Sequence, residues 1–242
     1  AFEIPKNSQV DLNLIIGSVL FGCGWSLGGF CPGPSFLGLL VGRSQSLICT
    51  AGIAIGAAAW RWHNRSEHAK FTADTLQEVG IVLAVFSLVW FIFRGDASQP
   101  QFTSDPGLPV HIGLLAGGFI GLAVLLMLGV NGKILGLSGL FGGLVDPTTS
   151  DKPFRSVFWI GFFTGGLIIK TIYPVALASS IPVSPFNSLL GGLLVGLGTG
   201  MANGCTSGHG VCGTSRLSVR SWVATATFMV ANAAFTSLTQ VF

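Results

Sequence analysis

The sequence predicts an all-α integral membrane protein of pseudo-repeated transmembrane helices, with short re-entrant or half-helices at Gly, Pro and Cys breaks. Half of its 242 residues are hydrophobic and only 9% are charged, whereas a soluble domain carries about a quarter charged residues. The mean hydropathy is +0.72. Its apolar segments are continuous runs without the alternating polarity of barrel strands, so helices are the expected spanning structure.

Seven apolar runs are candidate membrane segments. Several are shorter than the ~20 residues that a full helical span requires, so we expect some of them to be half-helices. A polar, Pro/Gly/Ser-rich linker at 94–109 is predicted to divide the chain into membrane modules at 1–93 and 110–242. The runs are Leu12–Gly29, Ser46–Trp60, Val79–Phe93, Val110–Val130, Phe154–Ile169, Ser188–Ala202 and Trp222–Leu238.

Glycine is very abundant, with 35 residues. In lipid there is no hydrophobic driving force between helices, so small residues that permit close backbone approach mediate the packing. We expect packing alone to explain most of the glycines. The two densest groups are Gly17, Gly22, Gly24, Gly28 and Gly29, and Gly191, Gly192, Gly196, Gly198 and Gly200.

Alignment of the sequence with itself at an offset of 174 residues reveals an internal repeat, in which Cys31 aligns with Cys205. In both copies a glycine-rich apolar run leads to a cysteine flanked by helix breakers, "GGFCPGPS" and "ANGCTSGHG". Repeats with paired, interrupted membrane segments are typical of secondary transporters, whose substrate sites lie near the bilayer midplane. The glycines that align are Gly17 with Gly191, Gly22 with Gly196, and Gly24 with Gly198.

Both aligned cysteines are expected at helix breaks at membrane depth. Pro32 and Pro34 lack backbone donors and are predicted to stop a helix at Cys31. Half-helices are predicted to begin after Pro34 and after Gly208, with their N–H groups and positive dipole ends directed into the break. The glycines that permit the second break are Gly204, Gly208, Gly210 and Gly213.

A third interrupted element is predicted within "VNGKILGLSGLFGGLVDP". Leu114–Val130 is long enough to span, Asn131-Gly132 is a turn signal, and Ile134–Val145 is too short to cross. We therefore expect Ile134–Val145 to form a re-entrant or half-crossing helix that ends before Asp146.

The chemistry of the breaks points to a soft anion. All nine Asp and Glu residues lie outside the apolar runs, which argues against a sodium or calcium site because hard cations require oxygen ligands. Thiols are weak S–H donors and suit transient binding of a sulfur-bearing anion such as thiosulfate, since conduction needs several weak sites. The candidate substrate-binding residues are Cys23, Cys31, Asn203, Cys205, Thr206, Ser207, His209 and Cys212.

Other uses of these groups stay open at this point. Cysteine often behaves as a small buried hydrophobe, which is the favoured interpretation of Cys49. Activated thiols at helix N-termini would suit a membrane thiol or persulfide oxidoreductase, although the sequence has no CxxC pair and no cofactor signature. A soft-metal permease is a further hypothesis, with four candidate tetrahedral ligands: Cys31, Cys205, His209 and Cys212.

Charge adds little about partners. The formal net charge of +3 is small and dispersed, so no nucleic acid partner is expected. We also expect no cofactor and no resident metal. Arg216 and Arg220 are predicted to lie at a membrane edge, and Lys133 and Lys170 to snorkel, with a role as topology anchors favoured over substrate binding for all four. A basic group weakly favours a cytoplasmic segment after Ser46–Trp60: Arg61, Arg65 and Lys70.

Two long segments resemble a known family. "NGKILGLSGLFGG" followed by "GMANGCTSGHGVCGTSRLSVRSWVATATFM" resembles the YeeE/YedE sulfur-transport family. "LIIGSVLFGCGWSLGGFCPGPS" resembles the companion module of that family, which in bacteria often occurs as a separate small protein. The similarity covers roughly residues 8–60 and 110–242.

The resemblance implies a multi-pass protein of the inner or plasma membrane that takes up thiosulfate or a related sulfur species and is not an enzyme. It implies that substrate passes between cysteines at the mouths of inward-dipping short helices. By motif these are Cys31 in "FCPGP" and Cys205 in "GCTSGHG", with Cys212 in the same signature. It also leaves room for a sulfurtransferase partner on the cytoplasmic side.

The order of the two modules departs from the family pattern. In fused relatives the "GCTSGHG" module is expected first, and here it follows "FCPGP". The expectation that follows is a permuted or truncated chain, or one completed by another subunit in the bilayer.

Overall fold

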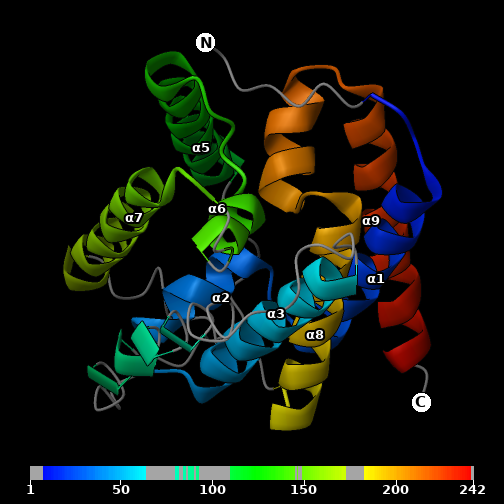
Figure 1. Cartoon of the computed structure of the whole chain (residues 1–242), viewed down its shortest axis with the longest axis horizontal. Coiled ribbons are helices and arrows are strands. Elements are labelled where there is room, and N and C mark those ends of the chain that lie inside the picture. Colours follow the sequence, from blue (N-terminus) through cyan, green and yellow to red (C-terminus); the bar gives the residue numbers. More distant parts are fainter. Residues whose placement is uncertain are drawn as a thin grey trace.

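A computed structural model of the chain describes residues 8–63, 110–144, 149–172 and 183–240, together with Asp146 and scattered positions between 80 and 92. Within these residues the chain is helical and contains no strand. Along the chain, each of three short helices, α2, α6 and η2, comes between two long ones (Figure 1). The helices are α1 (Leu12–Gly28), α2 (Pro32–Leu39), α3 (Ser44–His63), α5 (Val110–Asn131), α6 (Leu137–Leu144), α7 (Lys152–Ile172), α8 (Pro185–Ala202), η2 (Thr206–Gly213) and α9 (Val219–Gln240).

The predicted fold class, an all-α membrane protein, is confirmed. Six of the seven apolar runs coincide with long helices, and the run Val79–Phe93 is described only at scattered positions. In the described ranges, three segments are long and apolar enough to cross a membrane, and the pair α8 and η2, bent by 47°, gives a fourth. The three segments are Leu12–Leu39, Gly113–Asn131 and Lys152–Ile172.

The repeat predicted at a spacing of 174 residues is present as three pairs of helices. Shifted by 174 residues, α1 falls on 186–202, α2 on 206–213 and α3 on 218–237. These ranges are those of α8, η2 and α9, within three residues at each end. The two copies therefore share one plan, in which a long helix, a short helix and a second long helix follow one another.

The two copies are inverted with respect to each other. Gly17 of α1 lies against Gly198, and Gly24 lies against Gly191, so α1 and α8 run antiparallel. The helix α9 runs parallel to α1, because Asp11 pairs with Arg220 at one end and the Ser26 hydroxyl meets that of Thr236 at the other. By the same symmetry α3 runs parallel to α8. Antiparallel pairing of α1 with α8 implies a pseudo-two-fold axis in the membrane plane, as in transporters built from inverted repeats.

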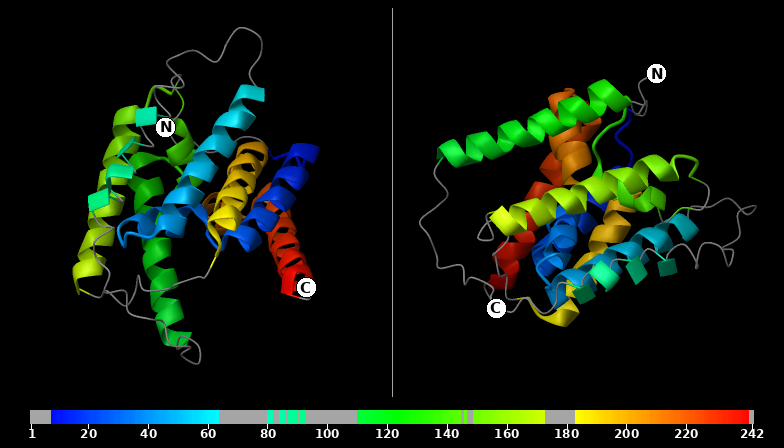
Figure 2. Two further views of the ribbon diagram at one scale, coloured as in Figure 1. Left: turned by 90° about the horizontal axis from the view of Figure 1, so that it is seen from below. Right: turned by 90° about the vertical axis from the view of Figure 1, so that its left-hand side faces the viewer.

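Glycine sets how closely these helices approach. A Cβ added at Gly198 would lie 2.6 Å from the Gly17 carbonyl oxygen, and one added at Gly24 would lie 2.8 Å from the Gly191 carbonyl oxygen. A real side chain does not fit at such distances from backbone, so the packing role predicted for these glycines is confirmed at the α1–α8 contact. Figure 2 shows these two helices side by side, with α3 and α9 flanking them.

The breaks begin and end at residues other than those predicted. The helix α1 ends at Gly29, whose φ of 68° is readily adopted by glycine, and not at the prolines. Pro32 begins α2, because the missing N–H and the fixed φ of proline suit the first helical position. In the second copy Asn203, with a φ of 59°, ends α8, and η2 begins at Thr206 instead of after Gly208.

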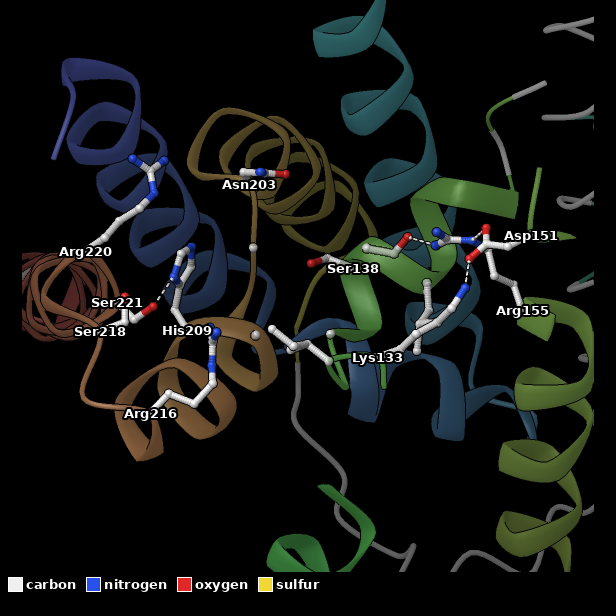
Figure 3. Close-up of a pocket in the computed structure, with 16 residues that line it drawn as sticks. Lys133, Ser138, Asp151, Arg155, Asn203, His209, Arg216, Ser218, Arg220 and Ser221 are labelled. Atoms are coloured by element: carbon white, nitrogen blue, oxygen red, sulfur yellow. Dashed lines mark hydrogen bonds and ion pairs between the residues drawn. The ribbon is translucent and has the colours of Figure 1, made fainter. Parts of the chain in front are cut away.

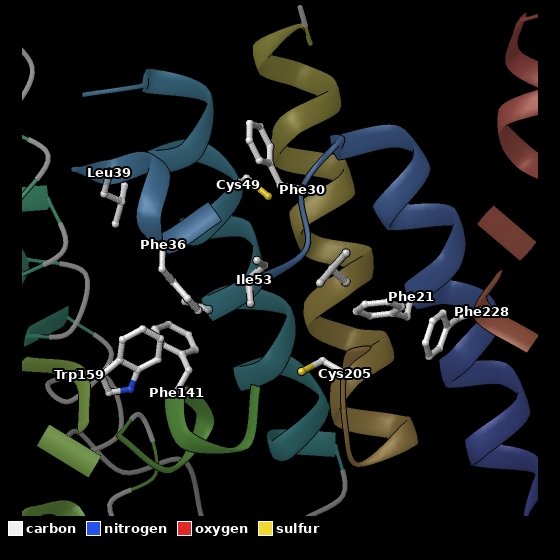
Figure 4. Close-up of a cluster of buried hydrophobic side chains, with 12 residues drawn as sticks. Phe21, Phe30, Phe36, Leu39, Cys49, Ile53, Phe141, Trp159, Cys205 and Phe228 are labelled. Atoms are coloured by element: carbon white, nitrogen blue, oxygen red, sulfur yellow. The ribbon is translucent and has the colours of Figure 1, made fainter. Parts of the chain in front are cut away.

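The third unit, α5–α6–α7, has the same long–short–long plan. The short helix predicted within Ile134–Val145 is α6, which ends at Leu144, before Asp146. An aromatic cluster holds it against α2 and α7 (Figure 4): the ring centroid of Phe36 lies 4.9 Å from that of Phe141 and 4.7 Å from that of Trp159. By contrast, most side chains of α5 are exposed, which suits a helix facing lipid.

Close approach at the α1–α8 contact predicts that Gly198→Ala lowers the thermal unfolding midpoint of the detergent-solubilised protein. Forcing a methyl group into this contact costs about 1–3 kcal/mol. The matched control is Gly117→Ala on α5, where an added Cβ meets no atom of the described residues within 4 Å. The control is expected to unfold at or above the wild-type temperature, and equal loss in both variants would contradict this packing.

Candidate functional site

Two cysteines lie at the tips of the short helices and face a common centre. Cys31 is the residue directly before α2, and Cys205 is the residue directly before η2. The Cys31 Sγ atom lies 2.7 Å from the hydroxyl oxygen of Thr206, the residue that directly follows Cys205 in the chain. The two breaks, 174 residues apart in the chain, therefore meet in the fold.

The third short helix joins the same centre. Ser207 Oγ lies 3.1 Å from Cys205 Sγ and accepts a hydrogen bond of 3.0 Å from the backbone N–H of Leu137, the first residue of α6. A Cβ added at Gly33, in the first turn of α2, would lie 2.9 Å from the Leu137 side chain. The N-termini of α2, η2 and α6 therefore converge on the thiols.

This convergence gives the centre a positive electrostatic character without a basic side chain at its middle. The first turn of a helix has backbone N–H groups with no intrahelical partner, and its dipole places roughly half a positive charge at that end. Among residues 32–34 of α2 only Gly33 offers such a group, since Pro32 and Pro34 have no N–H. Three such ends in one place form a site for an anion. The hydroxyls of Thr206 and Ser207 hold the thiols at its edge.

Cys212 belongs to the same group of side chains. It lies in the last turn of η2, and its thiol donates a 3.3 Å hydrogen bond to the Leu135 carbonyl oxygen, just before α6. Cys205, at the other end of η2, is only 2% exposed. The structure thus places Cys31 beside Cys205 at the start of η2, and Cys212 near its end, against the segment that leads into α6.

His209 acts as a brace between helices. Its Nε2 lies 3.1 Å from the Ala202 carbonyl oxygen, and its Nδ1 lies 3.1 Å from the Ser221 hydroxyl. Because a carbonyl only accepts, we assign the ring proton to Nε2, and Nδ1 then accepts from Ser221. The imidazole, 7% exposed, therefore ties η2 to the end of α8 and the start of α9.

The remaining sequence candidates lie around this centre. Asn203 ends α8 and lines the cavities described below. Cys23 lies half-buried in the middle of α1, and none of the hydrogen bonds of the three clustered thiols involves it. Cys49 is fully buried on α3, in an apolar cluster, as predicted for a small hydrophobe.

Two neighbouring cavities of about 270 and 390 Å³ lie beside the thiol centre. The smaller one separates η2 and the start of α9 from α6 and the connections that flank it (Figure 3). We refer to the two cavities together as the vestibule. Five residues line both of them: Ser138, Gly139, Asn203, Gly204 and Arg220.

The vestibule is basic. Arg216, Arg220 and Lys133 line the smaller cavity. Arg220 is 7% exposed and pairs with Asp11 at 3.3 Å, because α9 places it against the start of α1. The sequence did not reveal these positions, since Asp11 and Arg220 lie 209 residues apart.

An ion-pair triad forms one wall of the vestibule. Asp151 Oδ2 lies 2.5 Å from Lys133 Nζ, and Asp151 Oδ1 lies 2.6 Å from Arg155 Nε. Hydrogen bonds from Arg155 and then Lys133 lower the pKa of Asp151 to about 2. Arg155 also donates to the Gly139 carbonyl oxygen, so the triad fixes α6 to the start of α7.

The tetrahedral metal site considered from the sequence is not assembled in the described part of the chain. No group of three or more His, Cys, Asp and Glu side chains in that part is arranged to hold a metal ion. Both ring nitrogens of His209 already have protein partners.

The sequence is similar to those of known transport proteins. A family model described as sulphur transport matches residues 1–234. A "Probable transporter" of Xylella fastidiosa (strain 9a5c) is 38% identical over 122 residues, which are 50% of this chain and 88% of the relative. A "Thiosulfate transporter TsuA" of Spirochaeta thermophila is 24% identical over 253 aligned residues, which cover 90% of this chain and 74% of the relative.

The triad predicts a stability difference that depends on pH. The folded-state pKa of Asp151, about 2, lies below its ordinary value of 3.8. Its stabilising effect is therefore complete above that ordinary value and is lost as pH falls towards the folded-state pKa. Asp151→Asn is expected to unfold at a lower temperature than wild type near neutral pH, and the gap should close on acidification. A gap that stays constant over this range would contradict the assignment.

Proposed function

The chain belongs to the sulphur-transport family, and from this premise we propose that it moves thiosulfate or a related small sulfur-containing anion between cysteine thiols at broken-helix tips. Its setting would be the inner or plasma membrane, which its helices cross several times. The family and the relatives above are transporters and not enzymes. One observation carries the proposal: the thiols of Cys31 and Cys205 lie where three short-helix N-termini converge.

The vestibule provides the approach to this centre. Its basic side chains raise the local concentration of anions, because a cleft lined by one sign of charge focuses the field. From there the anion meets the turn that carries Cys205, since Gly204, Gly208 and His209 line the smaller cavity. The charged oxygens of the substrate would face the helix N-termini, and its sulfur would face the thiols.

Thiols suit the transfer itself because they bind sulfur weakly. A thiol donates a weak S–H hydrogen bond. The intact substrate anion can therefore move from one thiol to the next, among Cys31, Cys205 and Cys212, without being bound tightly at any of them. Transport requires several weak sites in sequence and not a single strong one. No covalent intermediate is needed in this scheme.

Beyond the thiols the passage is closed by apolar side chains. Cys205 belongs to the buried cluster that includes Phe36, Phe141 and Trp159, from α2, α6 and α7. Transport would therefore require these short helices to move apart on the side away from the vestibule. Motion of one repeat against the other around a fixed central site is the usual mode of inverted-repeat transporters.

Several sequence-based expectations remain predictions. These are the assignment of residues 1–93 to a fused companion module, the linker at 94–109, the partnership with a cytoplasmic sulfurtransferase and a completing subunit. The soft-metal permease has less support, because the described residues bring no three suitable ligands together.

Uptake of radiolabelled thiosulfate into proteoliposomes tests the proposal. Cys31→Ala and Cys205→Ala are each expected to lower uptake roughly tenfold or more, because each removes a thiol from the centre and leaves a half-buried hydroxyl without that partner. Cys49→Ala is the matched control, since it removes a buried thiol that takes no part in the hydrogen bonds at Thr206, Ser207 and Leu137. Uptake that is normal in both site variants would overturn the proposal, and sulfate and sulfide as competitors would define the substrate.

A further inference from the structure

Each of the three short helices has a cation bound to a carbonyl at its far end. Lys170 of α7 donates a 2.8 Å hydrogen bond from Nζ to the carbonyl oxygen of Leu40, the residue that caps α2. Arg216 donates from Nε to the Cys212 carbonyl oxygen in the last turn of η2, at 3.1 Å. Arg61 of α3 donates to the Gly142 carbonyl oxygen in the last turn of α6.

We propose that Lys170, Arg216 and Arg61 set the charge selectivity of the thiol centre, acting as positioning residues through the three short helices. The inference rests on the proposed function for its substrate, a small divalent sulfur oxyanion. Arg216 contacts a thiol-bearing residue only through the backbone carbonyl of Cys212, and none of the three contacts is made to a sulfur atom. The cations act at the C-terminal ends, and the anion would bind at the N-terminal ends.

The electrostatic reason is the shortness of the helices. Eight residues at 1.5 Å each make α2 and α6 roughly 12 Å long, and η2, a π-helix of eight residues, is shorter still because its turns are wider. The negative end of such a helix is near enough to oppose the positive end, and an apolar surrounding screens the opposition poorly. A cation on the last carbonyls offsets the negative end, so the positive potential at the thiols is retained.

The origin of the three cations argues against a role in anchoring alone. They come from α7, from the turn after η2 and from α3, yet each reaches the end of a short helix. Lys170 was expected to snorkel towards water, but its ammonium group extends across to α2. Arg61 also lies 3.6 Å from Asp146, which offsets part of its charge.

Lys170 offers the cleanest test of the three. Arg216 and Arg61 line the vestibule, so their loss would also change the approach of the substrate. Lys170 lines neither cavity and touches α2 at the end opposite Cys31. Removing its charge is expected to weaken anion binding at the thiols by roughly fivefold per unit of anion charge.

The test uses thiol labelling of the purified full chain, in a background with Cys23, Cys49 and Cys212 replaced by alanine. Two methanethiosulfonate reagents are compared, an anionic sulfonatoethyl form and a cationic trimethylammonioethyl form. Each forms a mixed disulfide with a cysteine thiolate and releases methanesulfinate. Their rate ratio cancels any general change in thiol reactivity and reports the local potential.

Because the two reagents differ by two charge units, Lys170→Met is expected to lower the anionic-to-cationic rate ratio by about 25-fold, and Lys170→Arg, which keeps the charge, is expected to restore it. In transport, Lys170→Met should raise the KM for thiosulfate more than it changes kcat. A ratio unchanged in Lys170→Met, or lowered equally in Lys170→Arg, would overturn the inference. Labelling does not require transport, so an absence of thiosulfate uptake by wild type would refute the proposed function and leave this test valid.

Discussion

A helix that begins inside a protein in a bilayer leaves backbone N–H groups without partners, and this constraint organises the molecule. Three short helices begin at one place, where Cys31, Cys205 and the N–H of Leu137 meet through two hydroxyls. The unpaired donors become useful when an anion satisfies them. Cations bind the carbonyls at the far ends of these helices. In our proposal the helix dipoles, which would be unfavourable in lipid, then produce a positive electrostatic potential at the thiols.

Inverted symmetry explains how one chain brings two such ends together. A long helix followed by a short re-entrant one places its break near midplane, and an antiparallel copy places a second break at the same depth. The glycines of α1 and α8 allow the two copies to approach until backbone touches backbone. The third unit, α5–α6–α7, adds the third short helix and one wall of the vestibule.

Much of this was visible in the sequence because it is local or periodic. Apolar runs predicted the long helices, and the 174-residue spacing predicted that Cys31 and Cys205 are equivalent. The sequence did not show where the short helices begin, since Pro32 can end one helix or start the next. It also did not show the vestibule, the bracing role of His209, or the reach of Lys170 to Leu40, which all depend on contacts distant in sequence.

The central claim is that the thiols at 31 and 205 share one centre. It is tested most directly in a chain whose only cysteines are these two, treated with one equivalent of mercuric ion, which bridges two thiolates. The account predicts that one ion blocks both thiols within a single chain, seen by mass spectrometry of the intact protein and by loss of both alkylation sites. Binding of two ions per chain, or cross-links only between chains, would contradict it.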